Sequence, residues 1–447
     1  MTDDDAERCE CSAQRDSLFA IQADSGVPLA DRERTSARGA ARVVHFLSMN
    51  LRGKTLVAAM SVGQMGGLLP HVAVPSTMPG WLIPEWGLSY GEAGLMASAY
   101  AIGYMLTVPV LTGLTDRIDA RRILILGSLI NGLATVAFGL LAEGMVSAMI
   151  LWGLTGLGFA GTYMPGLKAL TDRLGPGDSS RSVTIYTASF SFGVGLSFLV
   201  CQLIAEALGW RWAFILTGLP PLLMTYVAWS LEPVTPTPKA GPMIDLAPAL
   251  RNRAALGYSF AYGFHCFELY GVRTWLVAFW GFVAASGAAP LGAVAVSALF
   301  TLLAMPASIL GNELALRLGR HRAVTLVMLL SAAVGLAIGM TAGLSPWLTL
   351  ILMFVHAFTV PGDSGALTSG MAAAAHPMSR GATMAVHSTI GFAFTAAGGW
   401  VVGIALDFAG GVDRPHAWAL GYAVMAAGAA LGPVCLWWSR RTAKYPR

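Results

Sequence analysis

The sequence predicts an all-α membrane protein in which twelve transmembrane helices form two six-helix halves. Three observations support this fold class: an apolar composition, twelve long apolar runs, and a strong bias of basic residues to one side. The 447 residues are 55% hydrophobic and only 12% charged, with a mean hydropathy of +0.63. Soluble domains carry charge on about a quarter of their residues. Because this chain lacks that charge, its expected solvent is lipid.

The first expected element is a disordered cytoplasmic tail at residues 1–50. This segment is polar and mixes acidic residues such as Asp3 and Glu7 with arginines such as Arg38 and Arg42. A segment of this kind cannot bury enough apolar surface to fold alone. It also lacks the continuous apolar stretch of a cleavable signal peptide, so none is expected.

Twelve apolar runs follow, and each is long enough to cross a hydrocarbon core of about 30 Å as a helix. The seventh run is the longest, so we expect it to tilt, kink or protrude. Pro70 predicts a bend in the first. The runs cover residues 56–80, 92–112, 123–142, 146–168, 183–207, 212–231, 254–284, 290–311, 323–342, 347–370, 381–405 and 416–438.

The basic residues assign a side to each loop. With the N-terminus inside, the segment before the first run holds eight (Arg52 and Lys54 included), the inner loops thirteen and the C-terminal tail four, which together make 25 of the 28. Only Arg211 and Arg414 fall in outer loops, and Arg273 lies within the seventh run. Lys and Arg remain on the cytoplasmic side of a membrane. We therefore expect both termini in the cytoplasm, which also requires an even number of spans.

The chain repeats itself once. A Pro-rich stretch at residues 232–252 reads as a cytoplasmic linker between bundles at 51–231 and 253–440, with a short tail at 441–447. The basic loop after the second run, LTDRIDARR, has a counterpart after the eighth, LALRLGRHR, in which Leu316 replaces the acidic residue. Such internal duplication is typical of transporters that alternate access around a central site.

Twelve spans, a central linker and the Asp-Arg loop at Thr112–Arg122 together resemble the major facilitator superfamily of transporters. The resemblance covers about residues 50–440. The family loop usually reads Gly-x-Leu-x-Asp-Arg-x-Gly-Arg-Arg. This chain matches it at Leu114, Asp116, Arg117 and Arg121, and departs from it at Thr112 and Asp119.

The resemblance implies a gating role for this loop. In the family its acidic residue meets the cytoplasmic start of span eleven and steadies one conformation. Here Asp116, with Arg117 and Arg121, would meet the helix start near Arg380, where a helix N-terminus favours a carboxylate. The alternative is that the loop only anchors the topology and has no part in gating.

Several function classes lack their motifs. Proton-coupled exporters of the superfamily usually carry an Arg early in span four and Gly-Pro-x-x-Gly in span five, but here Trp152 takes the first position and the proline is missing. These departures argue against a drug/proton antiporter and favour a symporter, a uniporter or an uptake-type carrier. The chain also has no phosphate-binding loop or hydrolase motif. We therefore expect gradient-driven transport, no enzyme activity, no catalytic residue and no cofactor.

The candidate substrate and proton site lies in span seven, which carries Tyr258, Tyr262, His265, Glu268 and Arg273. At 100° per residue these five fall within about 140° of one another, so one helix face can turn to a water-filled cavity. His265 and Glu268 are three residues apart and predict a proton-carrying pair. Arg273 suits an anionic substrate group. Alternatively, Glu268 and Arg273 only neutralise each other.

Other spans add polar groups at membrane depth, where such groups are costly and often functional. Cavity candidates are Gln64 and His71 in span one, Tyr163 in span four, His356 in span ten and His387 in span eleven. Lys168 and Asp363 are assigned instead to cytoplasmic loop networks. The histidines are dispersed, and the two thiols of the tail make no ligand set, so no metal site is predicted.

The expected function is secondary active transport of a small solute by alternating access, with an anion favoured by Arg273 and proton symport through Glu268. The runs Gly87–Tyr104 and Phe267–Phe279 resemble prokaryotic carriers of the broad cyanate/nitrate-type group. Expected partners are the substrate, protons and the bilayer of the bacterial inner (plasma) membrane. The protein is expected to be a monomer that binds no nucleic acid. The alternatives are an efflux carrier and a transporter-like sensor or scaffold.

Overall fold

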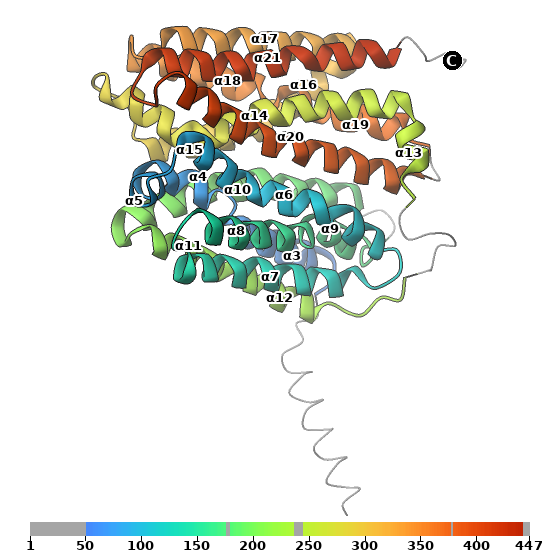
Figure 1. Ribbon diagram of the computed structural model, residues 1–447. Helices are drawn as coiled ribbons and strands as arrows, with labels where there is room; N and C mark the ends of the chain where they lie inside the picture. The colour runs from blue at the N-terminus through green and yellow to red at the C-terminus, as the bar shows by residue number, and fades with distance from the viewer. Residues whose placement is uncertain (1–50, 176–178, 237–244, 377–378, 441–447) are drawn as a thin grey trace, which may run out of the picture. The chain divides into compact units, whose positions relative to one another are not determined.

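The computed structural model describes residues 51–175, 179–236, 245–376 and 379–440 (Figure 1). The predicted tails at 1–50 and 441–447, and residues 237–244 of the predicted linker, lie outside the described residues. From Leu51 onward the chain forms one compact unit. Every secondary-structure element in the described ranges is helical.

We call the described residues before the linker the N-terminal half. Each of the six predicted apolar runs in it coincides with one helix or with a run of consecutive helices. The helices are α3 (Gly53–Leu68), α4 (Ala73–Thr77), η1 (Met78–Leu82), α5 (Ile83–Trp86), α6 (Tyr90–Leu114), α7 (Ala120–Leu141), α8 (Met145–Ala160), α9 (Tyr163–Thr171), α10 (Ser179–Leu208), α11 (Trp210–Gly218) and α12 (Pro220–Ser230).

The described residues after the linker form the C-terminal half, which repeats the pattern. A short helix within the predicted linker precedes it, and its first long helix has 33 residues. The helices are α13 (Ala247–Arg251), α14 (Arg253–Ala285), α15 (Ala293–Leu302), α16 (Ala304–Leu318), α17 (Arg320–Thr341), α18 (Pro346–Thr359), η2 (Pro361–Asp363), α19 (Ser364–Ala374), α20 (Arg380–Phe408) and α21 (Pro415–Arg440).

Ten helical segments of the described chain are long and apolar enough to cross a membrane. An eleventh is the pair formed by α3 and the helices from Ala73 to Trp86, which meet at 45°. Pro70 lies in the break, where its missing N–H interrupts the helix, as the sequence predicted. The remaining predicted span is α14, which is long enough but whose polar side chains, Glu268 and Arg273 among them, make it less apolar than the other spans.

Several helices begin at side chains that cap them. Ser89 accepts a hydrogen bond from the Glu92 amide at 3.1 Å, and Glu92 accepts one from the Ser89 amide at 2.9 Å, which is a capping box at the start of α6. Asn252 caps α14 by accepting from the Ala255 amide at 3.1 Å. These caps set where α6 and α14 begin, and so which of their residues reach the centre of the bundle.

Glycine contacts show the same close helix packing in both halves. In the N-terminal half, a Cβ on Gly156 of α8 would overlap the backbone carbonyl of Tyr100 on α6. In the C-terminal half, a Cβ on Gly311 of α16 would overlap the carbonyl of Gly362 in η2. Both pairs join the second and fourth spans of their half. Small residues let helix backbones approach closely in membranes, and this shared contact supports the internal duplication.

The two halves meet along α6 and α20, which run side by side (Figure 1). Asp407 of α20 accepts hydrogen bonds from the amides of Tyr90 and Gly91 at 2.8 and 2.7 Å. Further along, the Ser98 hydroxyl donates to the Ala396 carbonyl at 2.6 Å. These contacts lie toward the end of α6 that is opposite the Thr112–Arg122 loop. The halves are therefore held together on the side that the sequence predicts to be extracellular.

Candidate functional site

A small pocket lies between the two halves, near the middle of α6 and α14. Its lining includes His71 from the break after α3, Tyr100 of α6, Tyr270 and Arg273 of α14, and Phe392 of α20. Its volume is about 30 Å³, roughly the share of liquid volume that one water molecule occupies. Both halves contribute polar side chains to it, so its shape depends on how the halves sit against each other.

His71 joins the two halves through two tyrosines. Its Nδ1 lies 3.1 Å from the Tyr100 hydroxyl, and its Nε2 lies 3.4 Å from the Tyr270 hydroxyl. A neutral imidazole has one donor and one acceptor nitrogen, so one phenol donates to the ring and the other accepts from it. The ring also packs edge-on against Tyr100, with centroids 5.0 Å apart. His71 therefore lines the pocket and contacts one tyrosine from each half.

Arg273 supplies the permanent charge of the pocket. Its side chain is buried, and its guanidinium carbon lies 5.4 Å from the centre of the Tyr270 ring. Its Nε has no hydrogen-bond partner among the described residues, and no acidic residue lines the pocket. A buried cation without a carboxylate partner is costly. An anionic group in the pocket would offset that cost through a charge-assisted hydrogen bond.

His265 has a partner on a different helix from the one predicted. Its Nδ1 lies 2.6 Å from Oδ1 of Asp363, and both side chains are at most 3% exposed. The assignment of Asp363 to a cytoplasmic loop network was wrong. The reason is the helix break at η2, which interrupts the tenth span in its middle and turns Asp363 inward toward α14.

Glu268 also finds its partners on other helices. Its Oε1 accepts a hydrogen bond from the Ser331 hydroxyl of α17 at 2.8 Å and lies 3.1 Å from Nε2 of His356 on α18. All three residues are buried. The predicted pairing with His265 and the alternative pairing with Arg273 are therefore both replaced by a pairing with His356. Side-chain contacts between neighbouring helices depend on helix rotation, which spacing along one helix does not reveal.

Tyr262 lies between two histidines. Its ring stacks on His387 of α20 with centroids 4.2 Å apart, and on His265 with centroids 5.5 Å apart. His387 Nδ1 lies 3.3 Å from the Ser259 hydroxyl. Tyr262 and His387 thus join the buried group around Asp363.

Three predicted cavity residues lie elsewhere. Tyr258 packs near His321, with ring centroids 5.4 Å apart, toward the end of α14 that begins at Arg253. Gln64 donates to the Tyr186 carbonyl at 3.2 Å, and Tyr163 packs on Phe190 with centroids 4.9 Å apart. None of the three lines the central pocket. Of the five polar residues of span seven, Arg273 lines this pocket. That all five share one cavity face stays a prediction.

Sequence reasoning missed Tyr100, Tyr270 and Ser331. Tyr270 lies about 140° from His265 around the helix at 100° per residue, outside the face that was considered. Tyr100 lies in an apolar stretch of the second span, from which the sequence analysis named no cavity residue. Ser331 lies in a predicted span, residues 323–342, that contains no charged residue, histidine or tyrosine. A search for hydroxyl groups at the depth of the histidines would have found all three.

The loop after α6 is anchored by Asp119, which sequence reasoning had noted only as a departure from the family pattern. Both carboxylate oxygens lie 2.9 Å from Nη2 of Arg173, and the Val234 amide donates to Oδ2 at 2.8 Å. Burial alone would raise the pKa of this carboxyl group. Hydrogen bonds from the Val234 and Arg121 amides and from Arg173 outweigh burial, so the pKa is lowered below its ordinary value.

Other charged residues lie near the same end of the helices. The Arg121 guanidinium donates to the Leu231 carbonyl, which ties the loop to the start of the linker. Lys168 pairs with Asp172 one turn away at 2.9 Å, partly exposed, as expected of a loop network. Arg380 is exposed at the start of α20. The gating role of Asp116, Arg117, Arg121 and Arg380 stays a prediction.

Within the described ranges, no three His, Cys, Asp or Glu side chains come together as a group that could hold a metal ion. The buried His–carboxylate contacts are two pairs, each of which joins α14 to another helix. What this arrangement can do chemically is hold protons and attract an anion.

Comparison with known proteins finds transporters that are similar to part of this chain. The chain is 30% identical over 135 residues to a probable sulfoacetate transporter of Cupriavidus necator, covering 30% of this chain and 31% of that protein. It is 25% identical over 141 residues to a niacin transporter of Acinetobacter baylyi, covering 32% of each. The match therefore spans about a third of the length of these curated relatives.

Solved structures show the same fold over most of the chain. A bacterial homolog of the human lysosomal transporter Spinster, in an inward-facing and occupied conformation, superposes with a TM-score of 0.68. The superposition covers 87% of this chain and 96% of that one at 16% identity. The inward-facing, unoccupied structure superposes with a TM-score of 0.65 at 18% identity, covering 86% and 94% of the two chains.

The family model described as Major Facilitator Superfamily matches residues 56–399. This range includes all six predicted spans of the N-terminal half and the first four of the C-terminal half, with most of the fifth. It also includes the Asp-Arg loop and the central pocket residues. The chain therefore belongs to the Major Facilitator Superfamily, a family of membrane transporters and not of enzymes.

Proposed function

We propose that this protein is a secondary active transporter that moves a small organic anion across the membrane by alternating access. The observation that carries this proposal is the buried Arg273 at the interface of the two halves. It faces a pocket with no acidic lining residue, beside His71 and two tyrosine hydroxyls. Such a group of donors suits a carboxylate, sulfonate or phosphate.

The relatives support an anionic substrate. Sulfoacetate, niacin and hexose phosphate each carry an acidic group. The match to the proteins named for them covers about a third of this chain and about a third of each relative. None of these three is named as a cyanate or nitrate carrier, so the predicted subgroup gains no support from them. Substrate chemistry is thus better inferred from Arg273 than from the subgroup.

We propose that the two His–carboxylate pairs carry the proton for symport. His265 with Asp363 and Glu268 with His356 are buried at membrane depth, where ionisable groups are usually functional. A carboxylate–imidazole pair can accept or release a proton while its net charge changes by one. Because α14 carries both a member of each pair and Arg273, a movement of this helix would connect proton binding to substrate binding.

Alternating access would use the contacts at the two ends of α6. The bonds from Tyr90 and Gly91 to Asp407 hold the side opposite the Asp-Arg loop closed. The loop itself, with Asp116, Arg117 and Arg121, would meet Arg380 at the start of α20 when the other side closes. The pocket of about 30 Å³ is too small for an organic anion, so the proposal requires the halves to separate around it during transport.

We further propose a monomer in the bacterial inner membrane with both termini in the cytoplasm. The distribution of Lys and Arg over the loops supports this orientation. The proposed domain boundaries are bundles at 51–231 and 253–440, joined by a linker at 232–252. Efflux, and a sensing or scaffolding role without transport, remain the alternative functions.

Uptake into proteoliposomes tests the proposal. Purified protein is reconstituted and supplied with labelled sulfoacetate, nicotinate and other small carboxylates and sulfonates, chosen beforehand by a thermal-shift screen. We expect saturable uptake that Arg273→Gln lowers at least tenfold. Arg273→Lys should retain only part of the uptake, because Lys keeps the charge but not the planar fork.

Arg211→Gln is the matched control, since it removes an arginine near an outer loop that does not line the pocket. If the wild type shows uptake and Arg273→Gln leaves it unchanged, the proposed site is wrong. If no anion in the screen binds or is transported while the protein is folded, a sensor or scaffold becomes the better explanation.

A further inference from the structure

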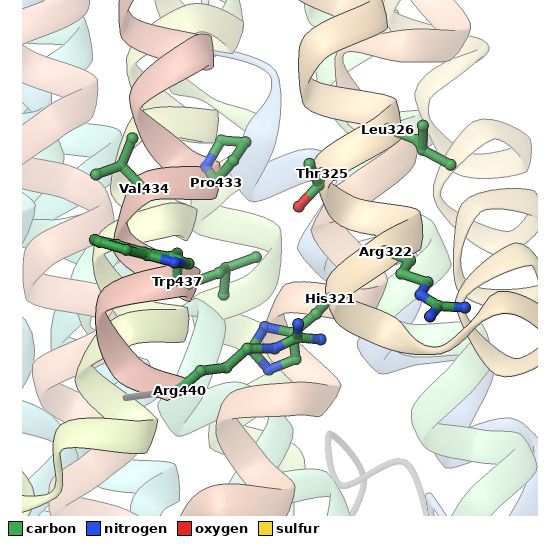
Figure 2. Close-up of a pocket in the computed structure, with 9 residues that line it drawn as sticks. His321, Arg322, Thr325, Leu326, Pro433, Val434, Trp437 and Arg440 are labelled. Carbon is green, nitrogen blue, oxygen red and sulfur yellow. The ribbon is translucent and has the colours of Figure 1, made fainter. Parts of the chain in front are cut away.

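A second, larger pocket lies on the outside of the C-terminal half, between α17 and α21 (Figure 2). Its volume is about 710 Å³. Its lining includes His321, Arg322 and Leu326 of α17, and Val434, Trp437 and Arg440 of α21. The pocket lies where α17 begins and α21 ends, on the same side of the membrane as the Asp-Arg loop.

One end of this pocket is positively charged. Arg322 and Arg440 are exposed and form no ion pair with any described residue. Figure 2 shows Arg440 extending from α21 toward His321 on α17. No acidic side chain lines the pocket. The N-terminus of α17, which begins at Arg320, adds the partial positive charge of a helix start.

The rest of the pocket wall is apolar and faces outward. Leu326 is 57% exposed, and Val434 and Trp437 are each 53% exposed. Leu326 lies one turn beyond Arg322, and Val434, Trp437 and Arg440 follow each other at three-residue spacing along one face of α21. A tryptophan next to the charged end is typical of the membrane–water interface. The pocket thus combines a cationic end with an apolar wall that continues toward the membrane interior.

The corresponding loop of the N-terminal half lacks this excess of positive charge. There Asp119 pairs with Arg173, and Asp116 adds a second acidic residue. The second copy, Leu314–Arg322, contains three arginines and a histidine but no acid. The C-terminal copy therefore includes the cationic Arg322, which forms no ion pair with any residue of the described ranges.

We propose that the pocket between α17 and α21 binds an anionic glycerophospholipid of the surrounding leaflet. Its phosphate contacts Arg322 and Arg440, and one acyl chain lies along Leu326, Val434 and Trp437. Basic pockets between transmembrane helices on the cytoplasmic side are suited to acidic head groups, and arginine binds phosphate oxygens bidentately. A soluble anion would use the charged end but would leave the apolar wall uncovered.

Lipid binding to purified, delipidated full-length protein tests this proposal. Native mass spectrometry measures the affinity for phosphatidylglycerol and for phosphatidylcholine of the same chain length, and thermal shift measures the stabilisation by each. We expect the protein to prefer phosphatidylglycerol, and the double variant Arg322→Gln/Arg440→Gln to weaken that binding at least tenfold. Phosphatidylcholine binding should change little.

Arg251→Gln is the matched control, because it removes an exposed arginine on the same side without touching the pocket. Trp437→Ala tests the apolar wall and should weaken binding of phosphatidylglycerol while leaving the arginines in place. Equal affinity for the two lipids would overturn the proposal, as would an unchanged preference in the double variant. A shift of equal size with inorganic phosphate alone would identify a soluble-anion site instead. None of these measurements depends on transport.

Discussion

The two halves share a helix pattern, but they bury different chemistry. Among the described residues of the N-terminal half, His71 is the buried histidine at membrane depth, and Asp119 is a buried acid in a loop. The C-terminal half buries a larger set of ionisable groups: His265, Glu268, Arg273, His356, Asp363 and His387. The contacts of the N-terminal half at the centre are mainly aromatic, whereas those of the C-terminal half pair imidazoles with carboxylates.

This difference indicates that the two halves share their helix packing but have different chemical roles. The close glycine contacts at Gly156 and Gly311 occur in both halves, so helix packing is common to them. Among the described residues, the buried charges at membrane depth lie in the C-terminal half, so the proposed proton and anion chemistry is concentrated on α14 and its neighbours. His71 and Tyr100 supply the N-terminal half's polar contribution to the central pocket.

The largest expected effect tests the shared scaffold. Gly156→Val and Gly311→Val should each prevent folding, because the new side chain would overlap a backbone carbonyl that cannot move aside. The cost should exceed about 4 kcal/mol, seen as loss of a monodisperse peak in size-exclusion chromatography. Gly67→Ala is the control, since a Cβ there meets no atom within 4 Å. A well-folded Gly311→Val protein beside an unfolded Gly156→Val protein would show that the packing is not shared.

The next prediction tests the chemical difference. Glu268→Gln and Asp363→Asn should each lower proton-driven uptake by at least tenfold while leaving counterflow exchange measurable, because the substrate pocket with Arg273 is intact. Tyr163→Phe, in the N-terminal half and away from the pocket, should change neither. Uptake driven by a proton gradient and exchange without one are compared in the same proteoliposomes. Equal losses in both assays would assign the carboxylates to substrate binding or folding instead of to the proton.

The smallest expected effect concerns the anchored loop of the N-terminal half. Asp119→Asn should lower stability by about 1–3 kcal/mol at neutral pH, because charged hydrogen bonds to Arg173 and Val234 are weakened. The folded-state pKa of Asp119 is lowered. Its contribution is therefore fully present above the ordinary Asp pKa and is lost as the pH falls through the lowered value.

Thermal unfolding at several pH values checks this sign. The difference in melting temperature between wild type and Asp119→Asn should be constant from pH 7 to about pH 5 and should shrink below about pH 4. Asp172→Asn is the comparison, because its pair with Lys168 is partly exposed and should contribute little. A difference that grows as the pH falls would contradict the assigned role of Asp119.

The sequence alone determined the membrane setting, the positions of all twelve apolar runs, the repeat and the family. These properties are local: a span is recognised from about twenty consecutive apolar residues, and its ends from nearby charges and breaks. The bend at Pro70 could be predicted in the same way, and so could the choice of His71 and Arg273 as cavity candidates. Each depends on one residue and its position within an apolar run.

Only the tertiary structure decided which polar groups meet. His265 contacts Asp363 across a helix break, and Glu268 contacts His356 and Ser331 on two other helices. Spacing along α14 placed His265 and Glu268 near each other but could not show the rotation of the neighbouring helices. That rotation depends on close packing between residues far apart in the chain, as at Gly311, where a Cβ would overlap the Gly362 carbonyl of η2.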